Sequence, residues 1–105
     1  WVRQSRDNYV WLWHLFKQLC AEYTFRYGRT HATERLVETL AFVPKNIPDT
    51  GFTEPTPAMP DDYKVAGDSI ESYRNYYFME KKRMWSWSGK INSRMVPSWL
   101  PIVNF

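Results

Sequence analysis

A proline-rich segment in the middle of the chain limits its fold more than any other feature. Residues 43–67, VPKNIPDTGFTEPTPAMPDDYKVAG, hold five of the seven prolines and two glycines. Proline lacks a backbone N–H and its ring clashes with the preceding helical turn, so regular helix is excluded from most of this segment. Apolar residues nevertheless recur through it, which favours an ordered loop over a free linker. These residues are Ile47, Phe52, Met59 and Tyr63.

The residues before this segment show the pattern of a helical hairpin. Aromatic and apolar residues recur at alternating steps of four and three, which predicts a long amphipathic helix over residues 7–27. Ser5 or Asp7 can cap its start, and Gly28 suits its end. A shorter helix is expected to follow and to end near Phe42, before the first proline of the loop. Only a few residues join the two helices, so we expect them to pack together.

A third helix is expected after the proline-rich segment. Asp68 to Glu71, DSIE, forms a capping-box sequence, and the helix is predicted over residues 69–85. The tail beyond Gly89 holds two prolines and should be extended or turned. Its large apolar residues are expected to pack back on the helices: Trp99, Leu100, Ile102 and Phe105. The sequence therefore predicts one all-α domain over residues 1–105, with three helices, a long proline-rich loop and an extended aromatic tail.

Composition narrows the classes of function. The chain has one cysteine, Cys20, and two histidines, so we expect no disulfide, no metal site and no cofactor. The scarcity of cysteine also predicts a cytoplasmic location. The net charge of +3 permits contact with nucleic acid without requiring it. No stretch approaches the roughly 18 apolar residues of a membrane span, so no membrane partner is expected. Aromatic residues make up 18% of the chain, which suits either a core or the stacking of bases.

The chain begins abruptly, at Trp1, in a stretch already dense in core-type residues, WVRQSRDNYVWLW. Natural domains seldom open in this way, so we expect the chain to be the C-terminal part of a longer protein. Aromatic surface left uncovered by a preceding segment would suit a second copy of the chain, which makes a homodimer a further expectation.

The stretch EYTFRYGRTH, from Glu22 to His31, gathers charged residues near the predicted end of the first helix. Glu22, Arg26 and Arg29 stand at i, i+4 and i+7 and so share one face. One interpretation is a solvated ion pair beside a helix end. The other is an anion pocket in which arginine forks and His31 bind phosphate while Glu22 serves as a general base. The residue pattern leaves both open.

Basic and aromatic residues alternate in and after the third predicted helix. Tyr73 and Arg74 lie in YRNYY, and Lys81 and Lys82 lie in EKKRMWSWSGK. Such a surface can stack bases and neutralise phosphates, and Arg3 can extend it. A partner-protein surface would have the same composition, and so would cations lying over buried rings. We expect nucleic-acid contacts at these five positions, with the other two interpretations as alternatives.

Several of these stretches resemble one known family. They are WVRQSRDNYVWLWHLF, EYTFRYGRTH, AMPDDYK and SIESYRNYYFMEK, with a closing W…R…VPSW, and they span Trp1 to Leu100. The family consists of small phage and phage-like proteins commonly labelled pyrimidine dimer DNA glycosylase. The resemblance implies a mainly helical, metal-free protein that flips a base, attacks the sugar with an N-terminal amine and cleaves the strand through a Schiff base, with a glutamate supporting the intermediate.

For this chain, the resemblance implies catalytic roles for Glu22 and His31, with Arg26, Tyr73 and Arg74 completing the site. It also implies that the acid, the arginines and the histidine meet in one concave pocket. Family members that resemble the chain carry a preceding segment with the true N-terminus, so no residue here is assigned the catalytic amine. The leading expectation is a phage DNA-repair-type protein that binds DNA in the host cytoplasm, truncated and inactive in this form. The alternative is a non-enzymatic phage interaction protein that binds a partner through its basic and aromatic surface.

Overall fold

The structure is a computed structural model of the chain, in which residues 1–100 are described. Its three α-helices are α1 (Arg6–Tyr27), α2 (Val37–Leu40) and α3 (Ser69–Glu80). Short 3-10 helices lie at Ala32–Leu36, Asp61–Tyr63 and Lys82–Met84. Over residues 1–100 there is no strand, apart from an isolated bridge between Val65 and Asp68. The predicted all-α class is therefore confirmed.

Local sequence sets both ends of α1. The Ser5 hydroxyl oxygen accepts a hydrogen bond from the backbone N–H of Asn8 at 3.1 Å. At the other end, Gly28 adopts a φ of 65° and donates its N–H to the carbonyl of Thr24. A residue without a Cβ adopts this left-handed conformation at the least cost. The predicted helix, its Ser5 cap and its glycine stop are all present.

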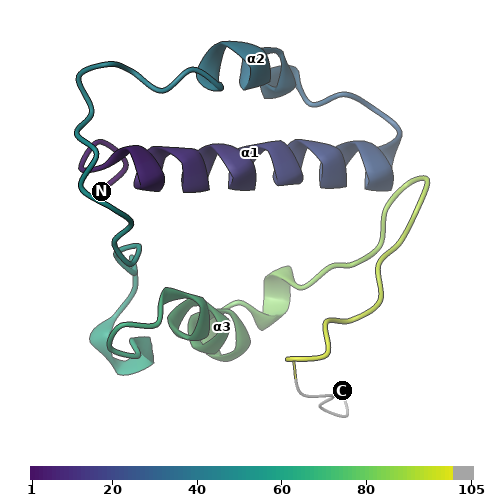
Figure 1. Cartoon of the computed structure of the whole chain (residues 1–105). Helices are drawn as coiled ribbons and strands as arrows, with labels where there is room; N and C mark the ends of the chain where they lie inside the picture. Colours follow the sequence, from purple (N-terminus) through teal and green to yellow (C-terminus); the bar gives the residue numbers. More distant parts are fainter. Residues whose placement is uncertain (101–105) are drawn as a thin grey trace.

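Helix α2 lies alongside α1, as the hairpin prediction required (Figure 1). The Tyr9 hydroxyl donates to the carbonyl of Leu40 at 2.7 Å, and the Trp13 indole donates to the carbonyl of Val37 at 2.9 Å. The second helix is shorter than predicted, because its first part is a 3-10 helix and its end comes at Leu40 rather than near Phe42. The bond from Tyr9 satisfies the carbonyl of Leu40, so no further helical turn is needed to supply a donor to it.

Helix α3 begins as predicted and ends early. The Asp68 carboxylate accepts a hydrogen bond from the N–H of Glu71 at 3.0 Å, which caps the first turn. The helix ends at Glu80, five residues before the predicted end at Trp85. Beyond it the chain folds back, so that the Trp85 indole donates to the carbonyl of Tyr77 at 3.1 Å. The indole is a second donor to a carbonyl that also accepts the backbone N–H of Lys81 at 3.1 Å.

The proline-rich loop is anchored on the start of α1 through one buried side chain. The side-chain amide of Asn8 donates to the carbonyl of Trp1 at 3.0 Å and to the Thr53 hydroxyl at 2.8 Å. Its oxygen accepts the N–H of Thr53 at 2.9 Å. Nearby, Ile47 is buried and Arg6 donates its N–H to the carbonyl of Pro48. These bonds fix where the loop leaves α1 and heads toward α3.

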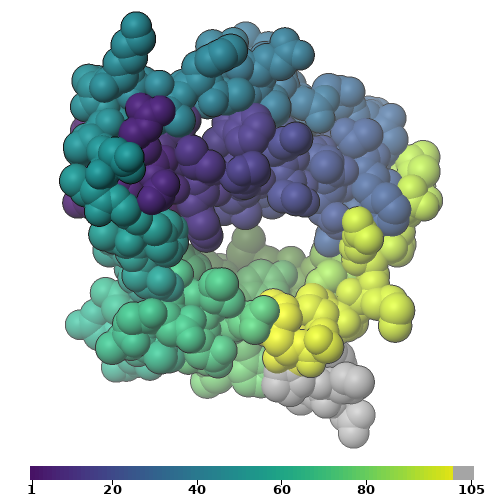
Figure 2. All heavy atoms as spheres, in the orientation of Figure 1, coloured from purple at the N-terminus to yellow at the C-terminus, as the bar shows by residue number. Residues whose placement is uncertain are grey.

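The described residues form an open ring rather than a closed helical bundle. Helices α1 and α3 do not pack directly on each other, and the loop and the tail join them at either end of α1 (Figure 1). The space between them stays open in the space-filling view (Figure 2). The Cα radius of gyration is 16.4 Å, against about 13 Å for a compact chain of this length. Only three apolar side chains among residues 1–100 are buried: Cys20, Ile47 and Leu100.

The tail runs from the end of α1 to α3 and closes the ring, instead of lying across all three helices (Figure 1). Of the residues expected to pack back on the helices, Trp99 contacts the Tyr77 ring of α3 and Leu100 is buried. Ile102 and Phe105 lie outside the described residues.

Candidate nucleic-acid interface

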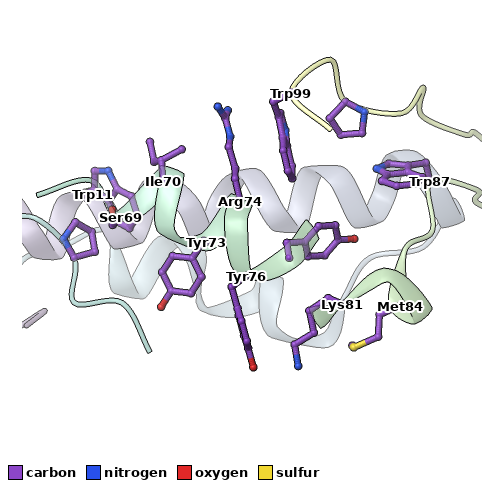
Figure 3. A pocket seen from close by; sticks show the side chains of 13 residues that line it. Trp11, Ser69, Ile70, Tyr73, Arg74, Tyr76, Lys81, Met84, Trp87 and Trp99 are labelled. Atoms are coloured by element: carbon purple, nitrogen blue, oxygen red, sulfur yellow. The ribbon is translucent and has the colours of Figure 1, made fainter. Parts of the chain in front are cut away.

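A hollow with a volume of about 630 Å³ lies between α1, α3 and the tail (Figure 3). Trp11 reaches it from α1, Trp87 and Trp99 reach it from the segments after α3, and α3 supplies the rest of the aromatic lining. Six aromatic side chains line this aromatic hollow: Trp11, Tyr73, Tyr76, Tyr77, Trp87 and Trp99. Two cations, Arg74 and Lys81, also border it. Ring faces and positive charge thus meet in one concave surface.

The spacing of residues on α3 explains why the aromatic side chains gather here. Tyr73 and Tyr77 stand four residues apart and so share a face of the helix. A neighbouring side of the helix is held by Ser72, which is fully buried and accepts the N–H of Val65 at 2.8 Å while donating to the carbonyl of Asp68 at 2.7 Å. With that side fixed on its own preceding loop, the tyrosine face is left to line the aromatic hollow.

Both cations of the aromatic hollow lie over rings. The Arg74 guanidinium is 5.1 Å from the centroid of Trp99, and the Lys81 ammonium is 5.1 Å from the centroid of Tyr76. Figure 3 shows the Arg74 and Trp99 side chains beside each other at one border of the hollow. A cation held over a ring face keeps its N–H groups at its edge, where an anion can accept from them. The arrangement can therefore bind a phosphate beside a stacked ring.

Glu22 lies outside the aromatic hollow and is fully engaged by two arginines. Arg94 donates to both carboxylate oxygens, with Nη2–Oε1 at 2.8 Å and Nε–Oε2 at 2.9 Å, and Arg26 Nε donates to Oε2 at 2.7 Å. The bonds from Arg94, followed by those from Arg26, lower the pKa of Glu22 to about 2. A carboxylate with so low a pKa is a weak proton acceptor. Through these contacts Glu22 anchors the tail to the end of α1.

Backbone contacts complete the attachment of the tail to the end of α1. The carbonyl of Arg26 accepts the N–H of Ile91 at 2.8 Å, and the side chain of Asn92 donates to the carbonyl of Phe25 at 2.9 Å. The Arg94 guanidinium lies 3.9 Å from the centroid of the Phe25 ring. At Gly89 an added Cβ would lie only 2.5 Å from the Arg26 carbonyl oxygen. Through this attachment α1 positions the segment that brings Trp99 to the aromatic hollow.

The predicted site residues therefore separate into groups. Tyr73, Arg74 and Lys81 come together at the aromatic hollow. Glu22 and Arg26 come together in the ion-pair cluster that holds the tail, and they do not line the aromatic hollow. The acid and the arginines expected in one concave pocket thus lie at two places.

The remaining predicted residues lie apart from the aromatic hollow. His31 is exposed, meets the Tyr23 ring edge-on at 4.8 Å between centroids, and pairs its Nδ1 with the Thr33 hydroxyl at 2.8 Å. Arg29 and Arg3 are exposed near opposite ends of α1, whose 22 residues span about 33 Å. The ammonium of Lys82 lies 4.7 Å from the ring centroid of Phe78. These four residues do not line the aromatic hollow with Arg74.

Three residues outside the helices matter here and were not among the predicted site residues. They are Trp87, Trp99 and Arg94, which line the aromatic hollow or hold the tail. The closing pattern W…R…VPSW contains Arg94 and Trp99, so the family resemblance carried a signal for two of them. Nothing in helical periodicity could indicate them, because all three lie outside helices.

Comparison with known proteins adds no relative, since no family model, curated protein or solved structure matches the chain. Among the described residues, no three His, Cys, Asp or Glu side chains are grouped as a metal site would require. Nor does any helix over residues 1–100 combine the length and apolar character needed to cross a membrane. The functional argument therefore depends on the geometry of the aromatic hollow.

Proposed function

We propose that this chain is the DNA-binding part of a repair-type protein and receives an unstacked base in the aromatic hollow. One observation carries the proposal: six aromatic side chains and two cations line a single concave surface of about 630 Å³. That volume lies within the range of roughly 300–1,000 Å³ typical of small-ligand sites. Stacking of a base on an aromatic side chain contributes about 1–3 kcal/mol, whatever the base.

The charges at the aromatic hollow suit the phosphates that flank such a base. Arg74 is exposed and lies over the Trp99 ring, so its donors can reach a phosphate while the ring stacks the base. Lys81 supplies a second cation over Tyr76. Binding of this kind releases counterions, and so its affinity falls as the salt concentration rises.

Glu22 has a positioning role in this proposal. Its bonds to Arg94 hold the tail that carries Trp99. The lyase chemistry implied by the family resemblance goes beyond binding and has its own test. Borohydride is added to the chain with ultraviolet-irradiated duplex DNA, and a trapped covalent adduct would extend the proposal to catalysis. Binding without an adduct is the expected result, because no residue of this chain is assigned the catalytic amine, and it would restrict the role of this chain to recognition.

Fluorescence anisotropy tests the binding itself. The chain is titrated with a labelled single strand, an intact duplex and an ultraviolet-irradiated duplex at several salt concentrations. We expect the single strand and the damaged duplex to bind more tightly than the intact duplex, because their bases unstack at lower cost. Absence of binding to all three at low salt would refute the proposal.

Matched variants assign the binding to the aromatic hollow. Trp99→Ala should weaken binding by about tenfold or more through lost stacking, and Arg74→Gln should reduce the slope of log affinity against log salt by about 1. Arg35→Gln removes an equal charge from an exposed residue before α2 and should change neither. Equal effects of Arg74→Gln and Arg35→Gln would mean that the affinity for DNA depends on the net charge of the chain and not on the aromatic hollow.

A second candidate is a partner protein, and the exposed apolar residues of the same hollow favour it. Ile70 and Met84 line the aromatic hollow and are 58% and 61% exposed. A protein segment with apolar side chains would bury both. Such a complex would tolerate salt, whereas DNA binding would not, so the salt titration separates the two candidates.

A further inference from the structure

A second hollow is lined by residues of α1, by Leu40 of α2 and by Val2. Helix α1 lies between α2 and α3 (Figure 1), and the aromatic hollow is lined from α1, α3 and the tail. The second hollow has a volume of about 280 Å³ and is lined only by apolar and aromatic residues. We call it the hairpin groove; its residues are Val2, Tyr9, Leu12, Trp13, Phe16 and Leu40. It has no role in the proposed binding of DNA.

Hydrogen bonds hold two walls of the hairpin groove in place. Tyr9 and Trp13 extend from α1, and each donates to a backbone carbonyl of α2, at Leu40 and Val37 respectively. Because these bonds already fix both rings, little conformational entropy is lost when an apolar side chain enters between them. The hairpin groove is therefore preformed.

A large apolar side chain lies next to the hairpin groove without entering it. Phe42 follows Leu40 by two residues and is 80% exposed. Leu12 and Leu40, both lining the groove, are also exposed, at 41% and 40%. The end of α2 thus supplies one wall of the groove, Leu40, and two residues later an exposed aromatic side chain of a size to fill such a groove. A surface with both features can pair with itself about a two-fold axis, because the aromatic side chain of each copy can fill the groove of the other.

The exposed area of the whole chain is large enough for such a pairing. The accessible surface is 8167 Å², whereas a folded monomer of 12.7 kDa exposes about 6,200 Å². The difference is of the order of 2,000 Å², while a stable interface of standard size buries about 800 Å² on each partner. The fold therefore leaves more surface uncovered than a stable dimer needs.

We propose that the surface around the hairpin groove binds a second copy of this chain, with Phe42 of each copy inserted into the hairpin groove of the other. Burial of both phenyl rings against Tyr9, Leu12 and Phe16 supplies the apolar contact. The aromatic hollow, on the α3 side of α1, stays accessible in each copy.

Sedimentation equilibrium over a wide range of protein concentration tests the proposal. The wild-type chain should form dimers, and Phe42→Asp should raise the dissociation constant by at least about 100-fold, because two phenyl rings lose their burial. Phe42 is so exposed in the single chain that the variant should keep the wild-type circular dichroism spectrum. Met95→Asp is the matched control, since Met95 is 92% exposed in the tail and should leave the dimer intact.

Two results would overturn the proposal. One is a wild-type chain that stays monomeric at every concentration, whether or not some other protein fills the groove. The other is a dimer that Phe42→Asp does not weaken more than Met95→Asp does. A photo-crosslinking amino acid at position 42 gives an independent measurement: the expected adduct joins two copies and maps to Tyr9, Leu12 or Phe16, and adducts confined elsewhere would contradict the proposed contact.

Discussion

Arg94 forms a bidentate ion pair with Glu22, although the two residues stand 72 positions apart in the chain. The pair joins the tail to the last turns of α1, at the point where the ring of the fold closes. The same tail carries Trp99 to the aromatic hollow. The ion pair at the end of α1 therefore holds the segment that supplies Trp99 to the aromatic hollow.

Arg94→Ala should free the tail. Without the guanidinium, the segment after Gly89 loses its ion pair with α1 and keeps the backbone bonds and the Asn92 bond there. We expect cleavage by chymotrypsin within the tail to become several-fold faster, as followed by mass spectrometry, because local opening exposes the chain to the protease. Lys64→Ala serves as the control, since its ion pair with Asp61 joins residues only three apart. Equal cleavage rates for wild type and Arg94→Ala would contradict the assignment.

The attachment of the tail should also depend on pH. The arginines lower the pKa of Glu22 from 4.5 to about 2, so the folded chain binds this proton less readily than the unfolded chain. Stability from this group is therefore fully present above about pH 4.5 and is lost as the pH falls toward 2. The protection factors of tail amides, which correct for the pH dependence of the intrinsic exchange rate, should fall in this range. Glu22→Gln should show faster exchange already at neutral pH and lose this dependence; an unchanged pH profile in that variant would assign the effect to another group.

Gly89→Ala should destabilise the fold through a steric clash. A Cβ at this position would lie 2.1 Å from the carbonyl oxygen of Asn92 and 2.5 Å from that of Arg26, and backbone atoms cannot move aside without disturbing the tail. We expect a loss of about 1–3 kcal/mol in the free energy of unfolding, measured by urea denaturation. Gly51→Ala, where no atom lies within 4 Å but φ is 88°, should cost only about 1 kcal/mol. A larger loss of unfolding free energy for Gly51→Ala than for Gly89→Ala would mean that the tail does not approach α1 as described.

Asn8→Ala should loosen the other end of the ring. Asn8 is fully buried and bonds Trp1 and Thr53, so its loss removes three hydrogen bonds that join the proline-rich loop to the start of α1. We expect a loss of about 3 kcal/mol in unfolding free energy, and faster hydrogen exchange at the Thr53 amide. Gln18→Ala, at an exposed position of the same helix, should change stability by less than about 0.5 kcal/mol. Similar losses in both variants would show that Asn8 contributes no more than a surface residue.

Features that depend on neighbours in the chain could be predicted from the sequence. Ser5 caps α1, Asp68 caps α3 and Gly28 ends α1, and each acts on a residue no more than four positions away. The predicted pairing of the first two helices is also present, with Tyr9 and Trp13 of α1 each bonded to α2. Where a distant or backward contact intervened, as at the early end of α3 beside Trp85, the predicted boundary was wrong.

The candidate site was only partly predictable for the same reason. Tyr73, Arg74 and Lys81 lie on or next to one helix, and the runs of basic and aromatic residues there were enough to predict them as site residues. The convergence of Trp11 and Trp99 with these residues depends on the course of the loop and the tail, which no local pattern encodes.

The sequence by itself therefore determined the all-α class, the caps and the helical hairpin, because these follow from backbone hydrogen bonding and side chains within a few residues. Only the tertiary structure decided whether Glu22 would be free to act as a base or bound as an anchor. That outcome depends on Arg94, a residue 72 positions away, and the two meet only because the loop and the tail bring the chain back to the end of α1.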